Sequence, residues 1–226
     1  NRVRMLRHKE CRGVAIARNT GLAHAVGSHV LFVDSDDRLT TDAINLLLNS
    51  IADHMAEDVF VGKWASESLT SDNAEMFVCP HVEKISSECF LLRLNESGYL
   101  PDVCWHYVVR RDFLLNNGIR FIDANVGEDQ AFVAEILVAA NELVLIPEHI
   151  YWHREKAGGQ KSLRDPETTI GFAKLIEHLS SLRSRHPLAK SKTEFLQRRL
   201  SNARAALGAR VALHNQAELL KVISYK

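Results

Sequence analysis

The chain has 226 residues, 46% of them hydrophobic, which suits one domain or a domain with an extension. Lys plus Arg equal Asp plus Glu at 28 each, so no net charge favours nucleic acid or a membrane surface. The four cysteines form no C-x-x-C pair, which predicts reduced, structural thiols in a cytoplasmic protein. No apolar run approaches the roughly 18 residues of a membrane span.

The first part of the chain predicts alternating strands and helices. In chain order these are a strand at 2–8, a helix at 13–27 ending at Gly27, a strand at 29–33, a helix at 40–55 and a strand at 58–66. Thr40 or Thr41 is the expected cap of the second helix. This alternation favours an α/β domain with a mostly parallel sheet flanked by helices.

The second part begins with weak signals from 67 to 100, which we interpret as a variable region. The expected elements beyond it are a strand leading into a short helix at 103–121, a helix at 127–143, two short strands at 144–155 broken at Pro147, and helical segments beyond 165 separated near Pro187. We therefore expect a domain at 1–163 and a helical C-terminal extension at 164–226. From Leu188 onward the chain has eight basic residues and only two acidic ones, so this extension is suited to contact with an anionic surface.

Three aspartates, Asp34, Asp36 and Asp37, follow the apolar run 29–33. Two carboxylates about 4 Å apart repel by roughly 4 kcal/mol, so a metal ion, a basic side chain or exposure to solvent must compensate them. Ligands of open α/β sheets bind beyond the carboxyl ends of strands, and alternate residues of an extended segment point the same way. Asp34 and Asp36 are thus candidates to face one Mg²⁺ or Mn²⁺ ion, with phosphate oxygens completing its shell. The alternative is an Asp-rich turn, with Asp37 contributing to the start of the next helix.

Two further segments carry candidate chemistry. Glu128 and Asp129 lie in the first turn of a predicted helix, where the dipole favours negative charge, and an aspartate held there can deprotonate an attacking alcohol. They are equally ordinary first-turn residues. Further on, His153 can bind a metal and Arg154 can clamp a phosphate, although a single histidine is often structural.

Four segments, in this order and spacing, resemble the inverting glycosyltransferases of family 2, which have the Rossmann-like GT-A fold. They are "GVAIARNTGLAHAVGSHVLFVDSDDRLTTDAI", "VCWHYVVRRDFLLNNGIRF", "GEDQAFVAEIL" and "IYWHREKAGGQKSL". The resemblance covers about 3–163. It implies transfer of a sugar from a nucleotide-diphosphate donor to a hydroxyl of a glycan or lipid-linked acceptor, with Mn²⁺ or Mg²⁺ bound, in the synthesis of a bacterial surface polysaccharide or similar glycan.

The resemblance also implies roles for single residues. Asp34 and Asp36 match the D-x-D pair that holds the donor and the metal, and His153 stands near a position that supplies a further metal ligand in some members. Asp129 matches the catalytic base of the E-D motif, with Glu128 beside it.

The A-R-N segment of the family, near the donor, is matched by Arg18 and Asn19, and Arg154 is a candidate for the donor phosphates. Two departures from the family pattern stand out. The strand, helix and strand that open its nucleotide-binding domain do not precede Asn1, and His106 and Tyr107 follow Trp105 where members often read W-N-K.

Two alternatives stay open at this point. One is a truncated, non-catalytic GT-A module with a scaffolding role through its helical, basic tail. The other is a phosphatase of the haloacid-dehalogenase type, which also places D-x-D after an apolar strand. That family expects Thr or Val two residues after the second aspartate, where this chain has Arg38. Whichever function holds, we expect a cytoplasmic protein whose basic C-terminal helices attach it peripherally at the inner face of the membrane.

Overall fold

The computed structural model describes residues 3–66, 81–154, 166–185 and 188–213. Within these ranges a six-stranded sheet has the order β1-β5-β3-β6-β2, and β4 pairs with β6 outside that path. The strands are β1 (His29–Leu31), β2 (Arg38–Leu39), β3 (Val59–Ser66), β4 (Glu83–Ser86), β5 (Tyr107–Arg110) and β6 (Glu142–His153). The helices are α1 (Val14–His24), α2 (Ala43–Asp53), α3 (Ser87–Ser97), α4 (Arg111–Asn116), α5 (Glu128–Ala139), α6 (Pro166–Arg185) and α7 (Lys190–Leu213).

The sheet is flanked by helices, as expected, but it is mixed rather than mostly parallel. Among the described strands only β3 and β6 pair in parallel, whereas β5 runs antiparallel to both β1 and β3. The sequence pattern does not determine the direction of β5. A long segment precedes this strand, so the chain can enter the sheet either parallel or antiparallel to its neighbours. The α/β class and the C-terminal helical part are confirmed.

Two predicted strands differ from the structure. Residues 3–8 are not a strand, and they have no pairing partner in the described ranges. The segment 144–155 contains one strand rather than two, because β6 continues through Pro147. Pairing with β3 shifts register there, from Gly62 opposite Ile146 to Lys63 opposite His149. A proline has no N–H to donate, so such an irregularity accommodates it.

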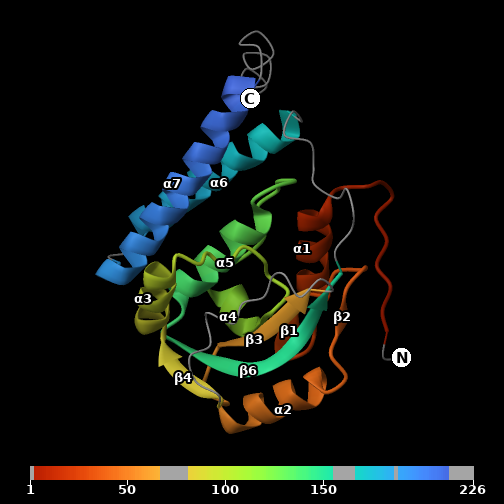
Figure 1. Ribbon diagram of the computed structural model, residues 1–226. Coiled ribbons are helices and arrows are strands. Elements are labelled where there is room, and N and C mark those ends of the chain that lie inside the picture. Colours follow the sequence, from red (N-terminus) through yellow and green to blue (C-terminus); the bar gives the residue numbers. More distant parts are fainter. Residues whose placement is uncertain (1–2, 67–80, 155–165, 186–187, 214–226) are drawn as a thin grey trace.

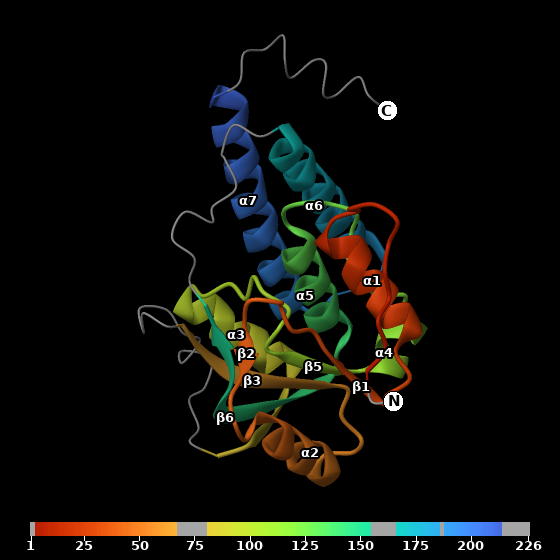
Figure 2. The ribbon, with the colours of Figure 1, turned by 90° about the vertical axis from the view of Figure 1, so that its right-hand side faces the viewer.

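Alternating side chains of β3 supply two separate cores. Val59 and Val61 face the core shared with α1, α3 and α5, whereas Phe60 and Trp64 face the core shared with α2. This is the period of two that a strand buried on both faces produces. Figures 1 and 2 show the result, with α2 covering one face of the sheet and α3, α4 and α5 covering the other.

The region of weak signals contains both β4 and α3. Ser86 caps α3 by accepting a hydrogen bond from the backbone N–H of Cys89, and Gly98 ends it in the left-handed conformation. The N-cap of α2 also differs from the expectation, because it is Asp42 rather than Thr40 or Thr41. Thr40 instead donates its hydroxyl to the carbonyl of His149 at 2.6 Å, which anchors the chain before α2 to β6.

The C-terminal helices pack on the rest of the chain. Buried residues of α6 and α7, among them Leu175, Leu179 and Phe195, belong to the same core as α5, and both views place these helices over α5 (Figures 1 and 2). The proposed boundary between 163 and 164 lies outside the described residues, so the division into domains stays a prediction.

Several basic residues of α7 point inward. Arg199 is 3% exposed and donates to the carboxylate of Asp102 at 2.8 Å and to the carbonyl of Pro101. Arg198 donates to the carbonyls of Leu94 and Tyr99, each at 2.7 Å. These arginines hold the segment between α3 and β5, and they are not arranged for an anionic surface. Within the described ranges, no helix combines the length and apolarity needed to span a membrane.

Candidate active site

Arg18 is the centre of a charged cluster beside the end of β1. It shares the inward face of α1 with Ala15 and Leu22, because positions three and four apart lie on one side of a helix, and its side chain is 10% exposed. Its guanidinium donates from Nη1 to Asp129 at 2.5 Å and from Nη2 to Asp34 at 2.7 Å. A basic side chain therefore compensates two of the predicted site carboxylates.

The position of Arg18 is supported from behind by Phe121. The guanidinium carbon lies 5.2 Å from the centroid of the Phe121 ring, and that ring stacks on Phe132 of α5 at 4.0 Å. Asn19 donates to the carbonyl of Phe121 at 2.8 Å and accepts from its N–H at 3.0 Å. The Asn19 amide thus holds the loop behind Arg18, and its hydrogen bonds are made to the protein backbone.

Asp129 and Glu128 begin α5. Gly127 precedes them in the left-handed conformation, with φ of 85°, which turns the chain into the helix. The Asp129 side chain is 18% exposed and that of Glu128 12%, and the latter lies 4.0 Å from Nη1 of Arg18. Both carboxylates therefore face the guanidinium.

Burial raises the pKa of Asp129 to about 7, while Arg18 acts in the opposite direction and Glu128 raises it further. Burial alone lowers the pKa of Arg18, but the carboxylates of Asp129 and Asp34 act in the opposite direction and its pKa is raised overall, so the guanidinium stays charged. The thiol of Cys104, which is fully buried, hydrogen-bonds to the Asp129 carboxylate. Burial raises the pKa of that thiol, which therefore stays protonated and serves as a donor.

The aspartates after β1 form a turn rather than an extended segment. The N–H of Asp37 donates to the carbonyl of Asp34 at 3.1 Å, which closes the turn. The expectation that Asp34 and Asp36 share one direction rested on an extended backbone, which the structure does not have here. Asp36 is half-buried in the turn.

Asp37, which the sequence suggested as a turn or helix-start residue, binds the end of β6. Its side chain is 1% exposed and accepts from the hydroxyl of Tyr151 at 2.7 Å and from the N–H of Arg154 at 2.8 Å. Nδ1 of His153 lies 3.3 Å away from it. The predicted site residues His153 and Arg154 thus lie next to the turn, and Arg154 is exposed.

Sequence reasoning missed Cys104, Tyr151 and the burial of Asp37. The alternation of Tyr151 and His153 along one strand was a signal that both side chains share a face. No signal pointed from Cys104 to Asp129, because their contact depends on how the loop before β5 packs. Trp105 is 3% exposed and belongs to the core beneath α2.

In the described part of the chain, no three or more His, Cys, Asp or Glu side chains are arranged to hold a metal ion. The donors at the turn are oxygens and one imidazole, which suit Mn²⁺ or Mg²⁺. Such an ion commonly takes one or two carboxylates and obtains its other ligands from phosphate and water. The residues therefore fit a cation that arrives with a diphosphate.

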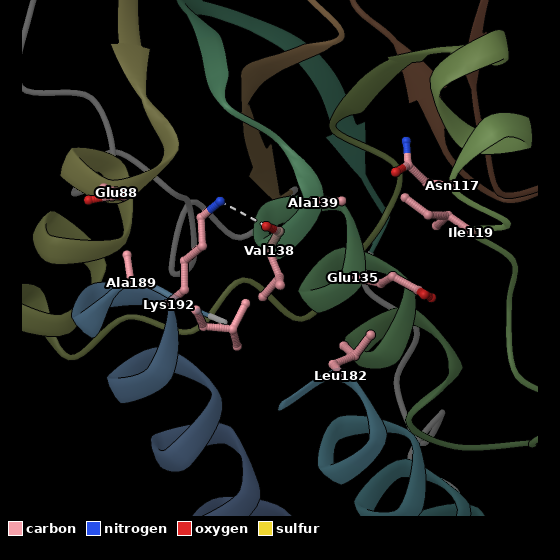
Figure 3. A pocket seen from close by; sticks show the side chains of 10 residues that line it. Glu88, Asn117, Ile119, Glu135, Val138, Ala139, Leu182, Ala189 and Lys192 are labelled. Carbon is pink, nitrogen blue, oxygen red and sulfur yellow. Dashed lines mark hydrogen bonds between the residues drawn. The ribbon is translucent and has the colours of Figure 1, made fainter. Parts of the chain in front are cut away.

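A separate cavity of about 350 Å³ lies between α3, α5, α6 and α7 (Figure 3). Its lining includes Glu135 and Val138, towards the far end of α5 from Asp129. The ammonium of Lys192 donates to the carbonyls of Val138 at 2.8 Å and Ala140 at 2.9 Å, which caps the end of α5. This cavity shares no residue with the Arg18 cluster.

A family model and several curated relatives match this chain. Residues 1–117 match the family model described as "Glycosyl transferase family 2". Glycosyltransferase GlyG of Streptococcus pneumoniae is 24% identical over 190 residues, which cover 80% of this chain and 60% of that protein. The minor teichoic acid biosynthesis protein GgaB of Bacillus subtilis is 27% identical over 159 residues, covering 69% of this chain and 17% of GgaB.

Solved structures show the same fold. The crystal structure of S. aureus TarS 1-349 in complex with UDP-GlcNAc matches with a TM-score of 0.65 and 22% identity, covering 86% of this chain and 55% of that one. The fold is thus the GT-A-like fold expected from the sequence. The chain spans only about half to three fifths of the length of GlyG and of this TarS chain.

Proposed function

This chain belongs to glycosyl transferase family 2, and we propose from this membership that it transfers a sugar from a nucleotide-diphosphate donor to an acceptor hydroxyl with inversion. Inversion corresponds to a single displacement, in which the acceptor oxygen attacks as the diphosphate leaves. The protein then needs a base for the acceptor and positive charge for the leaving group, and no covalent intermediate.

The observation that carries this proposal is the state of Asp129. A general base works best when its pKa lies near the working pH, and burial raises the pKa of Asp129 to about 7. Arg18 and the Cys104 thiol both hold its carboxylate in place. We assign Asp129 the role of taking the acceptor proton, with Glu128 beside it adding negative charge.

The leaving group is assigned to the turn and its neighbours. Asp34, Asp36 and His153 would hold Mn²⁺ or Mg²⁺, which when bound neutralises charge on the diphosphate. Arg18 carries a second positive charge within 2.7 Å of Asp34, and Arg154 is exposed next to the turn and suited to a phosphate. Asn19 contributes indirectly in this account, by fixing the loop that supports Arg18.

The relatives favour a role in building a polysaccharide or similar surface glycan, since one of them is named for teichoic acid biosynthesis. We propose a glycan or lipid-linked acceptor, used on the cytoplasmic side of a membrane. The inward contacts of Arg198 and Arg199 argue against a membrane surface formed by α7. Flotation with anionic liposomes tests peripheral attachment directly.

The test is transfer by the full gene product supplied with UDP- or GDP-sugars and Mn²⁺. Asp129→Asn keeps the shape of the side chain but cannot accept the proton, so transfer falls by about 100-fold or more, while nucleotide binding measured by calorimetry stays within about threefold. The same change at Asp53, an exposed residue at the end of α2, leaves both quantities unchanged.

Full transfer by Asp129→Asn would show that another group is the base. A wild-type protein that binds no nucleotide in the presence of Mn²⁺ would instead support the non-catalytic scaffold. The family match does not support the phosphatase alternative. In addition, Asp34, the aspartate that a phosphatase would use as its nucleophile, is paired with Arg18.

A further inference from the structure

Asp37 stands apart from the other aspartates of the turn because it is almost fully buried. Its side chain is 1% exposed, and three donors from β6 and the residue after it surround the carboxylate. They are the Tyr151 hydroxyl at 2.7 Å, the Arg154 N–H at 2.8 Å and Nδ1 of His153 at 3.3 Å. A helix-start residue or an exposed turn aspartate does not need such a set.

The Tyr151 hydroxyl extends these contacts back into the turn. It accepts from the N–H of Asp34 at 3.1 Å while donating to Asp37. A phenol hydroxyl has one hydrogen, which goes to Asp37, and lone pairs that accept the hydrogen bond from Asp34. Both ends of the turn, Asp34 and Asp37, are therefore fastened to a single side chain of β6. We name Asp37, Tyr151 and His153 with these bonds the Asp37 clasp.

Trp105 supports the clasp from one side. Tyr151 and His153 are two apart on β6 and so share a face of the sheet. The Tyr151 ring stacks on Trp105 at 4.2 Å and the His153 ring at 5.6 Å, each within 14° of parallel. Trp64 meets Trp105 edge to face at 5.0 Å. The aromatic stack limits rotation of the His153 ring, and Asp37 decides which nitrogen carries its hydrogen.

The tautomer of His153 follows from the chemistry of its partner. A carboxylate that accepts from a hydroxyl and an N–H has only acceptor capacity left, so Nδ1 must supply a hydrogen. In neutral His153 the lone pair is then on Nε2, which has no hydrogen-bond partner in the described part of the chain. Partners of this kind commonly orient histidine ligands in metal sites.

We propose that Asp37 is a positioning residue, which fastens the 34–37 turn to the end of β6 and keeps His153 in the tautomer that leaves Nε2 available to a ligand. This inference rests on the proposed function for its purpose, since a donor-bound cation is the ligand that Nε2 would meet. Its structural content, the tautomer and the fixed turn, belongs to the protein without any ligand.

Nitrogen NMR of the histidine-labelled, metal-free protein near pH 8 tests the structural content. The His153 signals, identified by their loss in His153→Gln, are expected to show hydrogen on Nδ1 and a lone pair on Nε2 in the wild type. Asp37→Asn shifts His153 towards the opposite tautomer, because an amide cannot satisfy all three donors. Tyr151→Phe keeps the ring stack and removes the link to Asp34, so it leaves the tautomer in place. Asp53→Asn is the matched control.

Mn²⁺ affinity in the presence of UDP gives the second readout. Asp37→Asn is expected to weaken it by about 10- to 100-fold, the usual effect of removing such a partner, with near-ultraviolet circular dichroism showing that the aromatic stack is kept. A wild-type His153 with its hydrogen on Nε2 overturns the inference.

An unchanged tautomer in a folded Asp37→Asn protein also overturns the inference. If the wild type shows the expected tautomer but binds neither nucleotide nor Mn²⁺, the positioning role of Asp37 is supported. The proposed transferase function is then contradicted.

Discussion

The raised pKa of Asp129 predicts a measurable cost of ionising this residue in the folded chain. An acid whose pKa rises on folding holds its proton more tightly in the native state. Its contribution to stability is complete below the ordinary pKa and is lost as the pH rises towards the folded value. With a folded pKa of about 7 and an unfolded value of 3.8, roughly 2.5 kcal/mol is lost between about pH 5 and about pH 8.

Asp129→Asn removes this titration and keeps the size of the side chain. The assay is urea unfolding of both proteins, followed by tryptophan fluorescence, at several pH values between about 5 and 8. The free energy of unfolding of the wild type should fall relative to that of the variant by roughly 2.5 kcal/mol across this range. Asp53→Asn should run parallel to the wild type. Parallel curves for wild type and Asp129→Asn would refute the claim that burial raises this pKa.

Two further predictions concern the supports of the site. A methyl group at Gly171 of α6 would lie 2.7 Å from the carbonyl oxygen of Val126, just before α5, so Gly171→Ala should destabilise the chain by about 1–3 kcal/mol. Gly208→Ala on α7 meets nothing within 4 Å and should stabilise it by roughly 0.5–1 kcal/mol, and thermal unfolding compares the two. Arg199→Met should reduce stability by about 1–3 kcal/mol through the unpaired groups it leaves, whereas Arg204→Met, at an exposed position of the same helix, should have little effect.

Most elements were predictable because their signals are local. The β3 strand is a mostly apolar run interrupted by Lys63, α4 is closed by Asn117 and Gly118, and α5 begins after a glycine with two acidic residues. The helix α3 lies in the region that we interpreted as variable, although it has local signals, since Ser86 and Gly98 are ordinary cap residues and Phe90, Leu91 and Leu94 are buried apolar side chains. These helices are specified by residues that lie close together in the sequence, so a sequence pattern can reveal them.

The direction of β5 and the continuity of β6 were not predictable in this way. Each depends on which strand lies alongside. β5 enters between β1 and β3 and opposes both, and the irregularity at Pro147 exists only in its pairing with Gly62 and Lys63. A proline in an apolar run therefore indicates a break by itself, and only the neighbouring strand shows that the strand resumes.

The carboxylates of the turn illustrate the same limit at the site. Their spacing correctly indicated that positive charge must be near, and left open which group supplies it. In the structure these carboxylates have different partners, because the closed turn places Asp34 against Arg18 and Asp37 against the end of β6. Arg18 reaches Asp129 from the core side of α1, and Tyr151 belongs to the core beneath α2. The turn therefore joins the two layers on either side of the sheet, so the packing of each layer sets where its carboxylates lie.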